Sequence, residues 1–430
     1  MHNRLVFIPL ALAVLFAIFY PTIGTTQEQA SCNISIDRSA VPELYFNDLT
    51  LIVQVNDASD FAVISNGKAI PFTQAGPNLL VTTDADSFSV VLTPGTNLAN
   101  LCDVEKAALL DDKRWAWSHG FDDNVNLLAS IQEFRDKSWP ATIFPIAKDY
   151  DQTREQDWIT DEPYVNRELL PEGWALGNHS WNHERFDTSE PTIENYRADI
   201  LDAQARFNES IARSSTPNFK VMVFASPNFS GNYDEPFSEA TQTTDLKLLE
   251  TGNDFMLVVT GDAAYAPEGS PVVAQPLTGR TKIGRDIAVE INPADVISKI
   301  DWMAANSTEF RRFWYNTLSH GDREANLKIV LEHIWNSYGP EGTNEAWVAS
   351  STEIYSYALT RDNAAISVET SDQIPEIEEG ETSPNKLYLP MITMMRNWLG
   401  LQTDAEDPKP LPAVLLKVSG HGLQQMKSAE

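Results

Sequence analysis

Between residues 106 and 362, short apolar runs alternate with longer amphipathic segments. The short runs have the length and apolar content of buried strands, as in RWAWSHGF, ATIFPIA, FKVMVFAS, DFMLVVT, FWYNTLSH and AWVASS. The segments between them have helical spacing, as in NVNLLASIQEFRDK, TIENYRADILDAQARFNESIAR, PADVISKIDWMAAN and NLKIVLEHIWNSY. Because strands that alternate with helices form parallel sheets covered by helices, the sequence predicts an α/β fold of barrel type for these residues.

The segments on either side of this region differ from it in composition. Residues 32–105 contain short alternating runs separated by Asn, Asp, Gly and Pro, which predict a small all-β domain. Residues 363–430 begin with acidic, proline-bearing chain, so we expect a linker followed by a C-terminal extension.

The N-terminus has the pattern of an export signal. Arg4 precedes the apolar run LVFIPLALAVLFAIFY, and the polar stretch PTIGTTQEQAS follows it. We expect residues 1–24 to be a signal peptide, which predicts a secreted, periplasmic or cell-surface protein without integral membrane association after cleavage. An uncleaved anchor is the alternative, because about sixteen apolar residues are at the short limit of a membrane span.

The two cysteines and the net charge indicate the redox environment of the protein and the binding partners that are disfavoured. Cys32 and Cys102 are the only cysteines, and in an exported chain they predict a disulfide, with two unpaired buried thiols as the alternative. The net charge is −30, from 61 acidic and 31 basic side chains, which opposes binding to nucleic acid and to anionic membranes.

Two adjacent aspartates follow the first strand-like run of the α/β region. Asp122 and Asp123 stand in SHGFDDN, at the predicted carboxyl end of that strand, where α/β proteins build their sites. At a strand exit, neighbouring carboxylates can approach one cation from different angles. The alternative is structural, because aspartate is also a favoured residue at the start of a helix.

A pair of histidines gives the second candidate. His179 and His183 are four residues apart in WALGNHSWNH, so a helical turn or a tight loop can bring their imidazoles together as Zn²⁺ ligands. A zincin-type protease would need Glu at the position of Ser180. Two histidines and one carboxylate would leave coordination positions for water and substrate, as in catalytic metal sites, whereas two packing histidines are the alternative.

Among the remaining histidines, His320 ends the apolar run FWYNTLSH and has a near-neutral pKa suited to general acid catalysis. His119, three residues before Asp122, competes with it for a role. His2, His333 and His421 stand in no site-like context, and we interpret them as non-catalytic.

Together these motifs resemble the polysaccharide deacetylases, the carbohydrate esterases that share the nodulation-type deacetylase domain. GFDDN resembles the family's Thr-Phe-Asp-Asp-Gly motif, LGNHSWNH its Gly-Asn-His-Thr/Ser-x-x-His block, and FWYNTLSHG its last motif. The order and spacing of the motifs agree over residues 106–362.

The resemblance implies a distorted (β/α) barrel and a mechanism. Asp123, His179 and His183 would bind a divalent metal, usually zinc, and Asp122 would be the general base. His320 would protonate the leaving group, and the substrate would be an acetylated polysaccharide.

The chain departs from the family pattern at several motifs. The usual Arg-x-Pro-Tyr/Phe-Gly motif reads FASPNFSG, with Ala225 or Ser226 at the position of the arginine that orients the base. Arg280 and Arg285 are the candidates to replace it. Asn124 stands where the family has a glycine after the aspartate pair. Phe229 is the candidate for the aromatic wall of the site, and Asp262 and Asp286 are the candidates for a fourth motif.

The leading hypothesis is therefore a secreted, metal-dependent hydrolase that removes N- or O-linked acetyl groups from a polysaccharide. A non-catalytic carbohydrate-binding or wall-associated protein on a deacetylase scaffold is the alternative, although binding alone needs no base. A glycosidase with paired carboxylates would leave the histidine pair unexplained.

Overall fold

The computed structural model describes residues 31–41, 48–55, 61–92, 102–123, 127–149, 165–183, 193–225, 227, 257–260, 282–309 and 311–371. Several sequence predictions lie outside these residues. They concern the signal peptide at 1–24, the C-terminal extension beyond 371, and the residues Asn124, Phe229, Asp262 and Arg280.

The centre of the α/β region is β9 (Trp115–Asp122), which is buried along its whole length. It pairs in parallel with β15 (Phe313–His320), and this register places His320 opposite Asp122. The other edge of β9 is shared by β10 (Thr142–Phe144) and β16 (Ala346–Val348), also in parallel. The predicted strands at these positions are confirmed.

The remaining strands close a ring. β10 pairs with β11 (Ala175–Leu176), and a second parallel sheet contains β12 (Val223–Ala225), β13 (Leu257–Thr260) and β14 (Lys282–Gly284). Single bridges join the two sheets, one from Asn178 to Phe224 and the other from Asp286 to Thr317. The described strands β9 to β15 thus follow one another around a distorted barrel, as the sequence predicts.

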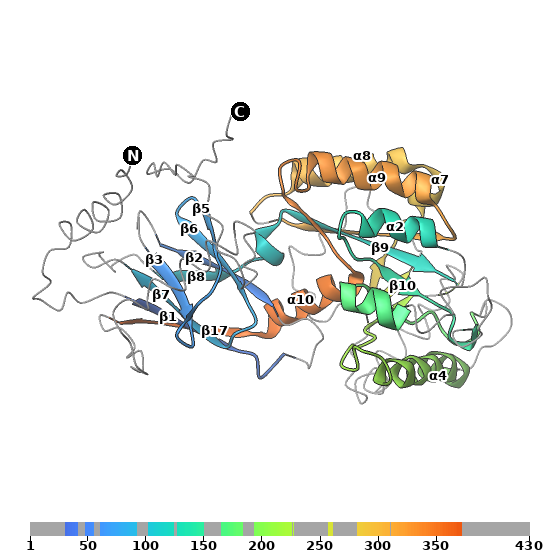
Figure 1. The fold of residues 1–430 in the computed structure, drawn as a ribbon, viewed down its shortest axis with the longest axis horizontal. Helices are drawn as coiled ribbons and strands as arrows, with labels where there is room; N and C mark the ends of the chain where they lie inside the picture. The colour runs from blue at the N-terminus through green and yellow to red at the C-terminus, as the bar shows by residue number, and fades with distance from the viewer. Residues whose placement is uncertain are drawn as a thin grey trace, which may run out of the picture. The chain divides into compact units, whose positions relative to one another are not determined.

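Helices pack around these strands, and α10 (Ser351–Asn363) among them lies against β9, β11 and β2 (Leu49–Gln54) (Figure 1). They are α2 (Leu128–Arg135), α4 (Ile193–Ala212), α7 (Ala288–Ile291), α8 (Pro293–Asn306), α9 (Glu324–Ser337) and α10 (Ser351–Asn363). Local chemistry fixes where they begin: the Asn292 side chain accepts a hydrogen bond from the Ala294 amide at α8, and Ser350 caps α10 through the Glu353 amide. None of the helices in the described part of the chain is long and apolar enough to span a membrane.

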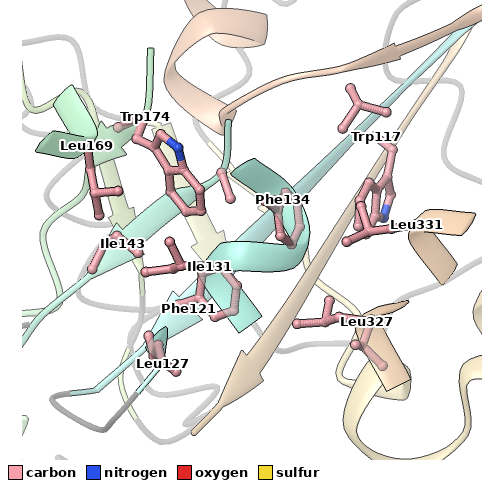
Figure 2. Packing of buried hydrophobic residues seen from close by; sticks show 14 of the residues in the cluster. Trp117, Phe121, Leu127, Ile131, Phe134, Ile143, Leu169, Trp174, Leu327 and Leu331 are labelled. Atoms are coloured by element: carbon pink, nitrogen blue, oxygen red, sulfur yellow. The ribbon is translucent and has the colours of Figure 1, made fainter. Parts of the chain in front are cut away.

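Alternation along β9 separates the core from the site. Trp117 and Phe121 point outward and pack against the inner face of α2, where Phe134 is fully buried (Figure 2). Because side chains alternate along a strand, Ser118, Gly120 and Asp122 face the other way, into the barrel. The outer face of β9 therefore supplies packing energy, and its inner face carries polar groups toward the carboxyl end of the strand.

The strands before β9 and after α10 form two antiparallel sheets. One has the order β17-β1-β7-β3-β4 and the other β5-β6-β2-β8. Their bounds are β1 (Ser31–Asp37), β2 (Leu49–Gln54), β3 (Phe61–Ser65), β4 (Lys68–Ala69), β5 (Thr73–Ala75), β6 (Asn78–Thr83), β7 (Ser87–Leu92), β8 (Asp103–Lys106) and β17 (Ala365–Ser371).

β17 lies within residues 363–430, which the sequence predicts to be a linker and a C-terminal extension. It pairs antiparallel with β1 over the full length of both strands, from Ser31 opposite Ser371 to Asp37 opposite Ala365. The β region is therefore built from two segments that are far apart in sequence.

A disulfide joins Cys32 in β1 to Cys102, which directly precedes β8. The pair closes a loop with a sequence separation of 70 residues. We expect the double variant Cys32→Ser, Cys102→Ser to lose about 4 kcal/mol of unfolding free energy, because the crosslink restricts the unfolded chain. Urea denaturation measures this loss, and reductant should destabilise the wild type while leaving the double variant unchanged. Equal stability of the two proteins would contradict the expectation.

Candidate active site

The two adjacent aspartates diverge at the end of β9. The Asp122 side chain is 2% exposed and points into the barrel, whereas that of Asp123 is 26% exposed. Asp123 has a φ of 68°, a left-handed conformation that is uncommon for a residue with a side chain. This turn gives the neighbouring carboxylates different directions, so they can take different roles.

A tight loop after β11 brings the two histidines together. Ser180 and His183 both have left-handed backbones, with φ of 64° and 54°. The loop is held by hydrogen bonds from the Ser180 amide to the Asn178 side chain, at 2.8 Å, and from the His183 amide to Ser180 Oγ, at 3.0 Å. Left-handed backbone at residues other than glycine is concentrated at functional sites because the surrounding structure must hold it.

Asp123, His179 and His183 form a cluster whose ligand atoms all lie within 4.8 Å of one another. Asp123 Oδ1 is 3.2 Å from His183 Nε2 and 3.5 Å from His179 Nε2. Nδ1 of His179 is 2.8 Å from the carbonyl oxygen of Ala225, so it donates its proton there and leaves a lone pair on Nε2. The structure therefore brings together the three residues that the sequence predicts as metal ligands.

The polar atoms of this cluster fit a cation. Among the residues that the structure describes, His179 Nε2 and Asp123 Oδ1 are buried and have no hydrogen-bond partner, which is costly unless another group binds them. Burial would raise the pKa of Asp123, but the two histidines lower it below its usual range. Burial and the nearby His179 lower the pKa of His183. A carboxylate and neutral imidazoles are the forms that bind a divalent metal.

Arg285 forms a fork around Asp122. Its Nη1 and Nη2 lie 2.6 and 2.7 Å from the two carboxylate oxygens, and both side chains are almost completely buried. Burial would raise the pKa of Asp122, but the charge and the hydrogen bonds of Arg285 outweigh it, and the pKa is lowered to about 2. Asp122 is thus a fixed carboxylate at neutral pH. Arg285 is one of two candidates in the sequence for the arginine that orients Asp122, and the structure shows that it binds this carboxylate.

His320 lies at the end of β15 and contacts Glu290 of α7. Nδ1 of His320 is 2.8 Å from Glu290 Oε1, and the His320 amide donates to the same oxygen. The hydrogen bond with Glu290 raises the pKa of His320 against the effect of burial. Arg323 approaches the other oxygen of Glu290 at 3.6 Å. This pairing favours the protonated form of the imidazole.

The variant Glu290→Gln tests this pairing. We expect the pKa of His320 to fall, because the glutamine carries no charge to stabilise the imidazolium. The resemblance implies that His320 is the general acid, and a general acid acts only when protonated, so the alkaline limb of the kcat profile should move to lower pH. The profile of acetate release against pH measures the shift, with Glu345→Gln, whose partner is Arg114 before β9, as the control. Identical profiles for Glu290→Gln and wild type would contradict the assignment.

His119, the competing histidine, has a structural environment. It is fully buried on the outer face of β9, where its nitrogens bond Thr317 Oγ1 at 2.9 Å and Ser319 Oγ at 3.0 Å. Burial lowers its pKa to about 3, so it remains neutral. It ties β9 to β15 and does not face the site.

Two other residues considered from the sequence also have partners elsewhere. Asp286 is buried and accepts a hydrogen bond from the Tyr315 hydroxyl at 2.7 Å, in addition to its ion pair with Lys299. His333 bonds Asp301 at 2.6 Å on the helical layer. Glu290 is the site residue that the sequence did not indicate, because a single glutamate in a four-residue helix belongs to no motif.

Several solved structures are similar to part of this chain. The Xyl-CE4 domain of a multidomain xylanase from the hindgut metagenome of Trinervitermes trinervoides is 14% identical, with a TM-score of 0.33, over 56% of this chain and 89% of that one. Peptidoglycan deacetylase PdaC from Bacillus subtilis is 13% identical, with a TM-score of 0.33, over 57% and 92%. BA3943 from Bacillus anthracis, a CE4 family pseudoenzyme, is 12% identical, with a TM-score of 0.31, over 56% and 66%.

A search of curated proteins found no match. The polysaccharide deacetylase family model matches residues 113–248, a segment that includes both aspartates and the histidine pair. Residues 113–248 therefore carry the sequence pattern of the polysaccharide deacetylase family.

Proposed function

We propose that this chain is a secreted, metal-dependent hydrolase that removes N- or O-linked acetyl groups from a polysaccharide. One observation carries the proposal: the cluster of Asp123, His179 and His183, whose ligand atoms lie within 4.8 Å of one another, adjoins a carboxylate that is fixed by an arginine. The family match to residues 113–248 supports the substrate class.

Asp123, His179 and His183 would hold the divalent cation, and zinc suits a set of two imidazoles and one carboxylate. When bound, such a cation polarises the acetyl carbonyl and makes water more acidic. The pairing of His179 Nδ1 with the Ala225 carbonyl orients the imidazole for this task.

Asp122 is the general base in this proposal. It takes a proton from the attacking water while the water oxygen forms a bond to the acetyl carbon. Arg285 contacts both carboxylate oxygens, but each oxygen keeps a second lone pair that can accept the proton. Because the Asp122 carboxylate is fixed before substrate arrives, little reorganisation accompanies the reaction.

His320 is the general acid. Its Nδ1 is engaged by Glu290, so Nε2 is the nitrogen that gives a proton to the leaving nitrogen or oxygen. The bond between the acetyl carbon and that atom then breaks. The products are acetate and a polysaccharide with a free amine or hydroxyl group. His320 lies opposite Asp122 in the register of β9 and β15, which supports an acid and a base at the same end of the barrel.

Export is part of the proposal. The sequence at residues 1–24 has the pattern of a signal peptide, and the disulfide between Cys32 and Cys102 suits an oxidising compartment. Polysaccharide substrates are found in the same extracellular or wall-associated setting.

The proposal is tested by measuring bound metal and released acetate on the same preparation. Purified protein should contain about one equivalent of zinc or another divalent metal by elemental analysis. It should release acetate from at least one member of a panel of N-acetylated chitooligosaccharides, peptidoglycan fragments and O-acetylated xylan, and chelation should stop the release. Metal without acetate release across this panel would support a carbohydrate-binding protein instead, and the absence of metal would refute the mechanism.

A further inference from the structure

The way in which Arg285 reaches Asp122 depends on an aromatic ring beneath it. The guanidinium carbon of Arg285 lies 5.2 Å from the centre of the Phe144 ring, on β10. In the described part of the chain, Nε of Arg285 is buried and has no hydrogen-bond partner, and the Asp122 carboxylate and the ring face stabilise the cation. The position of the ring therefore sets the position of the arginine.

Two glycines leave room for this ring. A Cβ atom on Gly120 would lie 2.8 Å from Phe144 Cε2 and 3.2 Å from Arg285 Nη1. A Cβ atom on Gly177 would lie 2.1 Å from Phe144 Cε1. Neither glycine has the left-handed backbone seen at Gly173, with φ of 87°, so space rather than conformation makes a side chain unfavourable at both positions.

We propose that Gly120, Phe144 and Gly177 form a shelf that makes Arg285 a positioning residue for Asp122. Gly120 is the decisive member, because a side chain there would displace both the ring and the guanidinium. The inference rests on the proposed role of Asp122 as the base. It also gives one explanation for two features of the sequence, namely glycine before Phe121 and the lack of an arginine at 225 or 226.

A double-variant cycle tests the shelf. We expect Gly120→Ala and Arg285→Ala each to lower kcat about 100-fold, because each shifts the base, while KM and metal content stay close to wild type. The double variant should be no slower than Arg285→Ala alone, since Gly120 acts through the arginine. Additive losses, about 10,000-fold in the double variant, would overturn the shelf.

Chemical rescue separates positioning from a merely structural role. Added guanidinium ion should restore part of the lost kcat in Arg285→Ala, because it can occupy the vacated space beside Asp122. Arg285→Lys, which retains a charge but lacks the fork, should fall between wild type and alanine. Arg312→Ala is the matched control: Arg312 is also a buried arginine, paired with Asp112 at 2.9 Å at the other end of β15, so its loss should leave kcat unchanged.

The outcomes distinguish this inference from the proposed function. If Arg285→Ala keeps wild-type kcat while Asp122→Asn loses it, the positioning role is wrong and the general base stands. If the wild type releases no acetate from the panel, the proposed function fails, and the shelf is then judged by urea denaturation of the same cycle. Unfolding losses that do not add would still support the shelf, whereas additive losses would reject it.

Discussion

Asp122→Asn should lower kcat for acetate release about 1000-fold and leave the bound metal in place. The magnitude is that of a general base, which contributes about 100-fold to 10,000-fold. Asparagine has nearly the same shape as aspartate but cannot accept a proton from water at neutral pH. The metal should remain because its predicted ligands, Asp123, His179 and His183, are unchanged.

The measurement combines steady-state kinetics with elemental analysis, on protein whose circular dichroism matches wild type. Asp123→Asn is the informative comparison, because it replaces the adjacent carboxylate and should lose metal as well as activity. The difference between two neighbours tests their separate roles directly. A variant Asp122→Asn that retains more than a tenth of wild-type kcat would show that another group is the base.

His183→Ala should lose both metal and activity. It removes one of three protein ligands from an open site, and we expect metal affinity to fall by more than about 100-fold, beyond the effect of losing a group that only supports a ligand. The kcat value measured at limiting metal should fall in proportion to occupancy, and a large excess of metal should restore part of it.

Equilibrium dialysis against a metal buffer measures the affinity. His333→Ala is the matched control, because His333 lies on α9 and bonds Asp301 away from the cluster. Its metal affinity should equal that of wild type. If His183→Ala binds metal as tightly as the control, the cluster of Asp123, His179 and His183 does not hold the metal.

Much of the site could be predicted because local pattern and barrel geometry act together. The apolar run before Asp122 and the run before His320 both predict strands, and the carboxyl ends of parallel strands meet at one end of a barrel. The structure pairs these two strands so that Asp122 and His320 are opposite one another. For these residues, recognising the strand was sufficient to locate the side chain.

The positions of Arg285 and Glu290 in the site could not be predicted from the sequence alone. Arg285 follows β14, and the bridge from Asp286 to Thr317 joins this segment to β15, which pairs with β9. Glu290 lies in a short helix whose position depends on the same closure of the barrel. Both contacts depend on pairing between distant segments, which periodicity within one segment does not reveal.

The pairing of β1 with β17 also determines the order in which the chain can be completed. During synthesis, β1 is made first, and about 330 further residues, including the whole barrel, follow before β17 is available. Until then the edge of β1 that β17 covers has no strand beside it, and an uncovered edge invites pairing with other chains. The barrel and its site are therefore made while the first sheet still lacks its last strand, so any shortening that removes residues 365–371 would expose this edge permanently.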